Sequence, residues 1–240
     1  MKFGIFSNNV LKIIACIFMV IDHIGFFLFP KVYVLRMLGR ISFPIFAFLL
    51  VEGCYYTKNK LRHLLVMIGF AAIIQAGLYI GTRMVSFSIF IPFSIAVLVC
   101  YLIDYIDKFI RNKKIILSIL LIVLSCLILG FSIYIDNISY LFYNNYGIYG
   151  FLVPVVMYLI RKYIKYLNLS IILCAIVLCI SMVLMHFFTS WLYQLYGIIG
   201  CLLILAYNGK KGKLNLKYFF YIFYPAHLII IYAIGMFFGG

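Results

Sequence analysis

The chain has few charged residues and very few acidic ones. Only 10% of its 240 residues are charged, and five acidic residues stand against 20 basic ones. Apolar residues make up 68% of the chain, in runs long enough to span a membrane. This composition excludes an ordinary soluble domain and indicates a polytopic membrane protein with almost nothing outside the bilayer.

The chain also lacks patterned cysteines and a signal-peptide cleavage site. Its seven cysteines are scattered singly through apolar segments, without CxxC spacing or matching histidines. Neither a zinc site nor a disulfide framework is therefore supported, and no metal is predicted. The first apolar run has no small-residue cleavage site and carries Asp22 and His23 near its centre, so we expect it to be retained as a span.

The apolar runs predict an all-α membrane helix bundle of about nine transmembrane helices, forming one domain over residues 1–240. Sixteen of the 20 basic residues fall in short clusters, at every second connection. The positive-inside rule then places the N-terminus on the inner side of a cell membrane and gives the clusters a topological role rather than one in nucleic-acid binding. The predicted spans are 10–29, 39–56, 64–82, 86–103, 115–135, 146–160, 168–187, 190–207 and 218–237.

Four basic residues break this orientation rule, because they fall on the predicted outer side: Lys31, Arg36, Arg40 and Arg83. Lys31 is interpreted as snorkelling to outer headgroups, a reading that stays open for Arg83. The arginines are candidates for a site. Prolines 44, 92, 154 and 225 fall within predicted spans, where each is expected to free a backbone carbonyl and kink or interrupt the helix.

Lys12 and His23 lie eleven residues apart in the first apolar run. On an α-helix this spacing returns to within about 20° of the starting face and climbs roughly 16 Å. The ammonium group of Lys12, at one membrane surface, and the imidazole of His23, deep inside the membrane, therefore lie on one face of the helix. A long cofactor could lie along this face. His23 is a candidate general base or acid.

Ionisable groups inside membrane spans are costly and indicate function. Asp22 points about 100° away from His23 on a helix, so an ion pair with Arg36 or Arg40 is the simpler expectation, beside a catalytic role. Glu52 is either a partner for a cytoplasmic lysine, the reading we favour, or part of a cofactor mouth. His227 near Pro225 is a further catalytic candidate, whereas His63 and His186, at span ends, are expected to be interfacial.

Three segments closely resemble the TraX family. They cover residues 12–30, 35–59 and 218–230, and contain the motifs MxxDHxG, GRxSFPxFxFLLxEG and YPxHL. TraX proteins are membrane proteins of conjugation systems that are required for N-terminal acetylation of pilin. The resemblance therefore implies an acetyltransferase or a related acyl carrier, which composition and spacing alone do not show.

A weaker similarity extends to the multi-span membrane acyltransferases that modify glycans. These proteins carry a basic residue, ten positions and a histidine in the first span, as Lys12 and His23 do here, and a late aromatic segment ending in histidine. The chain departs from them in the second span, where residues 50–53 read LVEG in place of an SG element. This similarity implies a shared mechanism but does not support a shared acceptor.

Together these observations predict acetyl transfer from cytosolic acetyl-CoA to an acceptor at the outer side. Lys12, Lys58 and Arg62 would hold the nucleotide phosphates, with Glu52 at the mouth. His23 would accept the proton of a peptide amine, a glycan hydroxyl or a small-molecule amine. The alternative is a non-enzymatic membrane assembly factor or transporter whose buried charges form a proton or substrate path.

Overall fold

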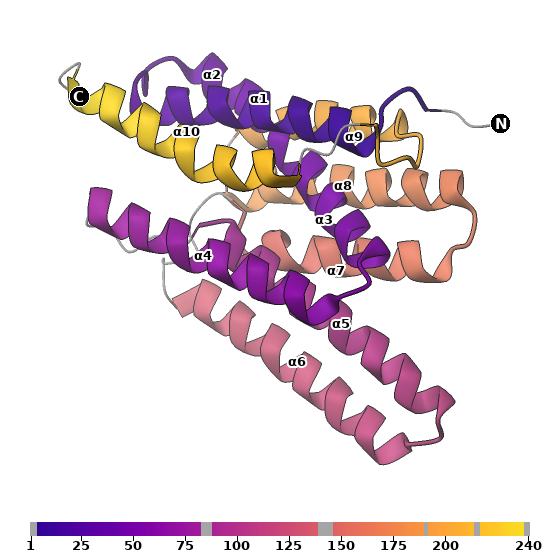
Figure 1. The fold of residues 1–240 in the computed structure, drawn as a ribbon. Coiled ribbons are helices and arrows are strands. Elements are labelled where there is room, and N and C mark those ends of the chain that lie inside the picture. Colours follow the sequence, from indigo (N-terminus) through magenta and orange to yellow (C-terminus); the bar gives the residue numbers. More distant parts are fainter. Residues whose placement is uncertain (1–3, 83–87, 139–145, 190–191, 214–216, 238–240) are drawn as a thin grey trace. The chain divides into compact units, whose positions relative to one another are not determined.

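The computed structural model describes residues 4–82, 88–138, 146–189, 192–213 and 217–237, and these residues are almost entirely helical (Figure 1). The helices are α1 (Asn8–Phe27), α2 (Tyr33–Gly39), α3 (Ser42–Tyr56), α4 (Lys60–Thr82), α5 (Phe90–Arg111), α6 (Ile115–Ile138), α7 (Tyr149–Tyr163), α8 (Leu167–Thr189), the 3-10 helix η2 (Leu192–Tyr196), α9 (Gly197–Leu205) and α10 (Lys217–Phe237).

The predicted all-α class is confirmed, and the chain is a multi-pass membrane protein. Each of the nine predicted runs overlaps a helix. Within the described ranges, six apolar helical segments are long enough to cross a bilayer, including 33–56 taken as one segment. Apolar segments 193–205 and 222–237 are shorter. The count of nine spans and the inward N-terminus stay predictions.

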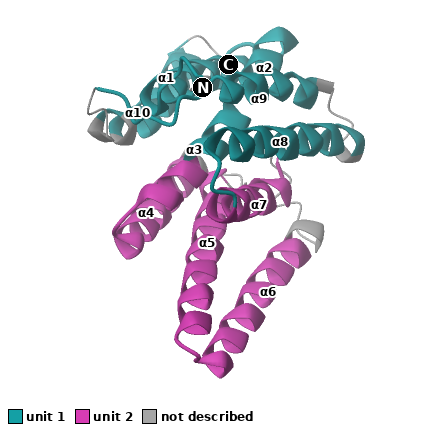
Figure 2. Ribbon diagram, turned by 90° about the vertical axis from the view of Figure 1, so that its right-hand side faces the viewer, with its two compact units in different colours: residues 1–49, 164–240 teal, residues 50–163 magenta. Residues whose placement is uncertain are grey.

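The chain forms two compact units (Figure 2). Unit 1 comprises residues 1–49 and 164–240, so it joins the two ends of the sequence, and unit 2 comprises residues 50–163. In unit 1, α1 packs against α2 and α10, and α8 packs against α9. In unit 2, α5 packs against α4, α6 and α7. The single domain predicted over residues 1–240 is not tested by this division.

Close helix contacts in unit 1 depend on glycine. A Cβ atom at Gly39 of α2 would collide with the side chain of Asp22 on α1, and one at Gly200 of α9 would collide with the Ile41 carbonyl and Pro44. Small residues permit this backbone approach between membrane helices. The contact at Gly39 brings α2 directly against the part of α1 that carries Asp22 and His23.

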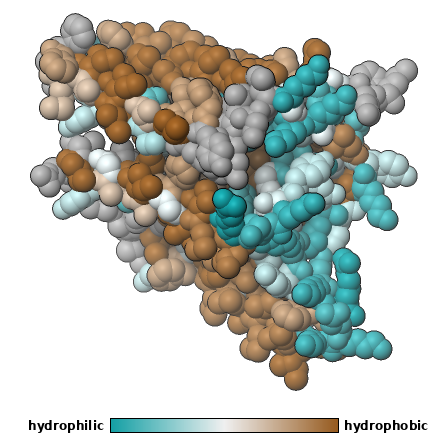
Figure 3. Space-filling model, in the orientation of Figure 1, coloured by the Kyte–Doolittle hydropathy of each residue, from teal (hydrophilic) through white to brown (hydrophobic). Residues whose placement is uncertain are grey.

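The surface of α6 in unit 2 is apolar and faces outward. Ile116, Leu127 and Phe131 are 79%, 64% and 65% exposed. Figure 3 shows this hydrophobic surface over α6, with hydrophilic side chains gathered at the α5–α6 turn. A helix that exposes such side chains along its length is suited to contact with lipid rather than water.

Two of the four span prolines lie at the start of a helix rather than in its interior. Pro44 and Pro92 lie in the first turns of α3 and α5, where a proline removes no helical hydrogen bond. The predicted kinks at these two positions are therefore wrong. Pro154 and Pro225 lie inside α7 and α10, and both helices continue through them.

Candidate active site

His23 and His227 meet in unit 1. His23 on α1 and His227 on α10 are 204 positions apart in sequence, but His23 Nδ1 lies 3.1 Å from His227 Nε2. The ring centroids are 5.1 Å apart. His227 is 6% exposed and His23 is half-buried. Two of the predicted catalytic residues therefore form a direct imidazole pair.

The backbone of α10 fixes which nitrogen of each ring carries a proton. His227 Nδ1 lies 2.9 Å from the carbonyl oxygen of Phe223, which can only accept, so Nδ1 of the neutral ring is the donor. His227 Nε2 is then an acceptor, and His23 Nδ1 donates to it. The remaining nitrogen of neutral His23, Nε2, keeps its lone pair. This is the tautomer that a general base needs.

The predicted ion pair of Asp22 with the early arginines is confirmed. Arg36 Nη1 donates to Asp22 Oδ2 at 2.7 Å, and Arg40 Nη2 lies 3.9 Å from Asp22 Oδ1. Arg36 also lies 5.0 Å from the centroid of the Phe26 ring. The side chain of Arg40 is only 1% exposed. These contacts join α1 to α2, through Arg36, and to the residue that follows α2, Arg40.

The shared helix face predicted on the first span is present, because α1 is continuous from Asn8 to Phe27. Lys12 and His23 therefore share a helix face over roughly 16 Å. Lys12 is half-buried and lies close enough to Lys211 for the two charges to repel each other. The face that carries His23 thus runs toward a cluster of positive charge.

The residues predicted to bind the nucleotide phosphates of acetyl-CoA belong to different units. Lys12 belongs to unit 1, whereas Lys58 and Arg62, which are exposed, belong to unit 2. Their joint role stays a prediction. Arg83 lies outside the described residues.

Glu52 has an arginine partner, so the expected lysine is wrong. Arg161 Nε of α7 donates to Glu52 Oε1 at 2.5 Å, and the two side chains are 4% and 0% exposed. The Arg161 guanidinium also lies 5.1 Å from the centroid of the Tyr55 ring. This buried pair joins α3 and α7 within unit 2.

A second polar cluster in unit 2 was not predicted. Lys162 Nζ lies 2.8 Å from Asp104 and 2.5 Å from Asp107, and Lys60 Nζ lies 2.5 Å from Asp104. Tyr158 donates to Asp104 at 2.6 Å. Partial burial lowers the pKa of Lys162, but its hydrogen bonds with both carboxylates outweigh burial, so the pKa is raised. The spacing of Asp104 and Asp107 on one helix face was the available signal.

Two cysteines and a histidine also gather in unit 2. Cys54 lies beside Cys100 and His63, and His63 Nδ1 lies 2.5 Å from the Tyr101 hydroxyl. His63 is half-buried in the first turn of α4, and its expected interfacial position stays a prediction. In the described part of the chain, no group of three histidine, cysteine or acidic side chains could hold a metal.

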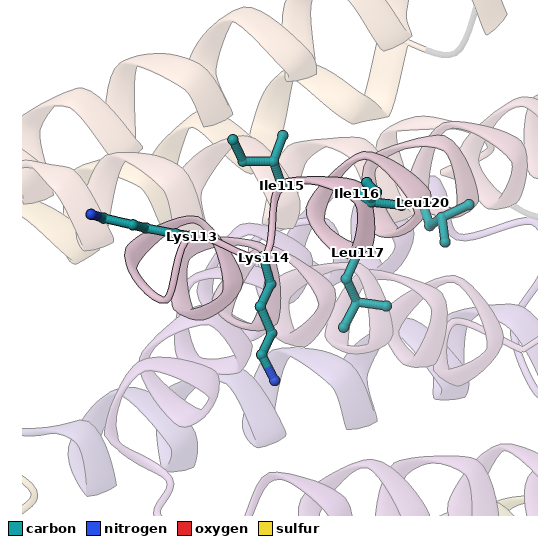
Figure 4. Close-up of a pocket in the computed structure, with 6 residues that line it drawn as sticks. All are labelled: Lys113, Lys114, Ile115, Ile116, Leu117 and Leu120. Carbon is teal, nitrogen blue, oxygen red and sulfur yellow. The ribbon is translucent and has the colours of Figure 1, made fainter.

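An open pocket lies at the α5–α6 turn of unit 2 (Figure 4). Lys113 and Lys114 extend from it in different directions, among apolar side chains. The lining offers no carboxylate, hydroxyl, thiol or imidazole. Such a mixture suits the water–lipid boundary, where lysines reach toward headgroups. Its residues are Lys113, Lys114, Ile115, Ile116, Leu117 and Leu120.

The comparison with known families identifies the chain. The family model described as TraX protein matches residues 7–235. The chain belongs to the TraX family. The resemblance carried by the three sequence motifs is thus confirmed, and it includes the segments that supply His23, Asp22, Arg36, Arg40 and His227.

Two relatives are similar to this TraX-family chain over different lengths. The probable fimbrial assembly protein FimC, serogroup H1, of Dichelobacter nodosus is 26% identical over 252 residues, which cover 97% of each chain. An uncharacterized protein of Rickettsia prowazekii is 42% identical over 55 residues, which are 23% of this chain and 22% of that protein. No solved structure matches the chain.

Proposed function

We propose that this TraX-family protein is a membrane acetyltransferase that uses acetyl-CoA as donor and His23 as general base. The observation that carries the proposal is the imidazole pair, in which the Phe223 carbonyl holds His227, and His227 holds His23 with Nε2 basic. A structural histidine needs one hydrogen bond, whereas this relay orients a particular nitrogen. In other enzymes too, a base that activates a nucleophile is oriented by a hydrogen bond from a third group.

In the proposed transfer step, the acceptor loses a proton to His23 as it attacks the thioester of the donor. His23 Nε2 accepts the proton of the acceptor amine or hydroxyl, and the acceptor lone pair attacks the thioester carbonyl carbon. The new C–N or C–O bond forms, the C–S bond breaks, and the thiolate of CoA leaves. The imidazolium of His23 returns its proton to that thiolate. His227 keeps His23 oriented throughout, because its Nε2 accepts from His23 Nδ1 in both protonation states of His23.

The neighbouring charges suit this step. Arg36 and Arg40 bring two positive charges to one carboxylate, Asp22, so the cluster has a net charge of +1 beside His23 in sequence. Positive charge favours the negative oxygen that develops on the thioester. Lys12, on the same face of α1 as His23, would hold a phosphate of the donor as a point charge.

The acceptor we favour is a protein amine at the outer side of the bacterial cytoplasmic membrane. The relative from Dichelobacter nodosus is named a probable fimbrial assembly protein and covers 97% of this chain. Fimbriae are built from secreted protein subunits, which supports a peptide amine over a glycan or a small molecule. The non-enzymatic assembly role is the alternative that this name also supports.

The test uses inverted membrane vesicles from source cells in which the chromosomal copy has been replaced by a plasmid-borne variant. Labelled acetyl-CoA is supplied on the cytosolic face, and label on luminal and membrane acceptors is counted. His23→Ala should lower transfer by about a hundredfold or more, because a general base contributes about 10²–10⁴-fold.

The matched control is His186→Ala on α8, a histidine whose ring centroid lies 5.5 Å from that of Phe187. This variant should keep the wild-type rate. Transfer by His23→Ala at the wild-type rate would reject His23 as the general base. Wild-type protein that transfers no more label than vesicles lacking the protein would reject the enzymatic proposal and leave the assembly role as the explanation for the family.

A further inference from the structure

The segment between α9 and α10 contains a lysine-rich loop, Asn-Gly-Lys-Lys-Gly-Lys at residues 208–213. The backbone of Gly209 has a φ of 72° and that of Gly212 has a φ of 96°. Both values lie in the left-handed region that glycine tolerates without strain. The two glycines therefore give Lys210 and Lys211 a defined turn conformation.

The loop is fastened to the beginning of α1. Phe6 donates to the Ala206 carbonyl and Asn208 donates to the Phe6 carbonyl, both at 2.9 Å. The amides of Asn8 and Asn9 donate to the carbonyls of Lys210 and Lys211, at 2.8 Å and 3.2 Å. The first amides of α1 are thus bound by protein. A ligand at this place would therefore be bound by the lysine side chains and not by the amides of the helix terminus.

The lysines of this loop gather positive charge around Lys12. Lys210, Lys211 and Lys213 are exposed, and Lys211 lies close enough to the half-buried Lys12 for their charges to repel each other. Asp22 is the only acidic residue in the sequence of unit 1, and it pairs with Arg36 and Arg40. It also lies about 15 Å further along α1. The cluster therefore has no acidic side chain of its own unit to balance it.

We infer that Lys12 and the 208–213 loop form a phosphate-binding site on unit 1, and that this site takes the phosphates of the acyl donor. The assignment to the donor rests on the proposed function. CoA carries a 3′-phosphate and a diphosphate, which several ammonium groups on one loop can bind together. Within unit 1, Lys211 is the basic residue that already lies beside Lys12.

Anionic phospholipid headgroups offer the same phosphate chemistry, so the experiment compares the two sources. Full-length protein is placed in nanodiscs of zwitterionic lipid, and its affinities for CoA and for 3′-dephospho-CoA are measured. Retention of an anionic phospholipid is measured separately by native mass spectrometry. The variants are Lys211→Ala, Lys211→Ala with Lys213→Ala, and Lys211→Arg, which keeps the charge.

Loss of Lys211 should weaken CoA binding by about tenfold or more, since a charged hydrogen bond contributes about 1.5–3 kcal/mol. The double variant should also lose the preference for CoA over the 3′-dephospho form, and Lys211→Arg should bind nearly as wild type. Lys165→Ala removes an exposed lysine of the same unit and should change nothing. Thermal unfolding verifies that each variant is folded, as expected because the loop uses its backbone to bind α1.

Wild-type CoA affinity in the folded double variant would overturn the inference. Loss of anionic lipid with unchanged CoA binding would overturn the assignment to the donor. His23→Ala separates this result from the proposed function, because it should bind CoA normally and fail only in transfer. Normal transfer by His23→Ala, together with lysine-dependent CoA binding, would reject the general base while keeping the phosphate site.

Discussion

At the residue scale, the cost of a buried charge depends on its partner. Glu52 and Arg161 are almost fully buried and lie 2.5 Å apart. Removing one partner leaves the other charged and unpaired in an apolar setting, which typically costs about 3–5 kcal/mol. Removing both partners is far less costly, because no charge then remains to be buried.

Glu52→Leu should therefore lower the free energy of unfolding by about 3–5 kcal/mol, and Glu52→Leu with Arg161→Met should recover most of this loss. Denaturation in detergent, followed by circular dichroism, measures the difference. The control is Lys60→Met, whose partner Asp104 keeps Lys162 and whose side chain is 35% exposed. That loss should stay within about 1 kcal/mol. Equal stability of Glu52→Leu and wild type would contradict this account.

The sequence predicts ion pairs between residues close together in the chain better than ion pairs between residues far apart in it. Asp22 and Arg36 are only 14 residues apart, on the first predicted run and in the short connection that follows it, and their ion pair was predicted. Glu52 and Arg161 are 109 positions apart. A single sequence does not specify which distant spans meet, so a basic partner was expected for Glu52 but its identity was not found.

At the element scale, hydrophobic runs located the helices but not their interruptions. Every predicted run contains a helix, because apolar length is what a membrane requires. Helix α2 was missed, since its seven residues are too few for a span and include Arg36. The prolines at 44 and 92 were misread because their effect depends on the helix start, which a hydropathy pattern locates only to within several residues.

Helix contact at Gly39 offers a test that removes no chemical group. Gly39→Ala adds a Cβ atom that would collide with the Asp22 side chain. Moving Asp22 should disturb Arg36 and the adjacent His23, and displacements of about 1 Å can cost up to about a hundredfold in rate. We expect acetyl transfer to fall by at least about tenfold, measured in the vesicle assay.

Gly130→Ala is the matched control, because a Cβ atom at Gly130 of α6 meets nothing within 4 Å. It should keep the wild-type rate and gain slightly in helix stability. A Gly39→Ala protein that transfers acetyl groups at the full rate would show that the α1–α2 approach does not position the site.

At the scale of the whole molecule, the candidate site depends on joining the ends of the chain. His23 is near the N-terminal end and His227 near the C-terminal end, and both belong to unit 1. Each residue was identified from its own apolar run, as an ionisable group inside a membrane span. Their contact was not predicted, because they are 204 positions apart and nothing in the sequence between them specifies that α10 packs against α1.

The central claim is that His227 acts by orienting His23, and a double-mutant cycle on the acetyl-transfer rate tests it most directly. His23→Ala, His227→Phe and the double variant are compared with wild type in the inverted-vesicle assay. If the histidines act as one unit, each single variant is slow and the double variant is no slower than His23→Ala. Losses that add in full, or a wild-type rate in His227→Phe, would contradict the account.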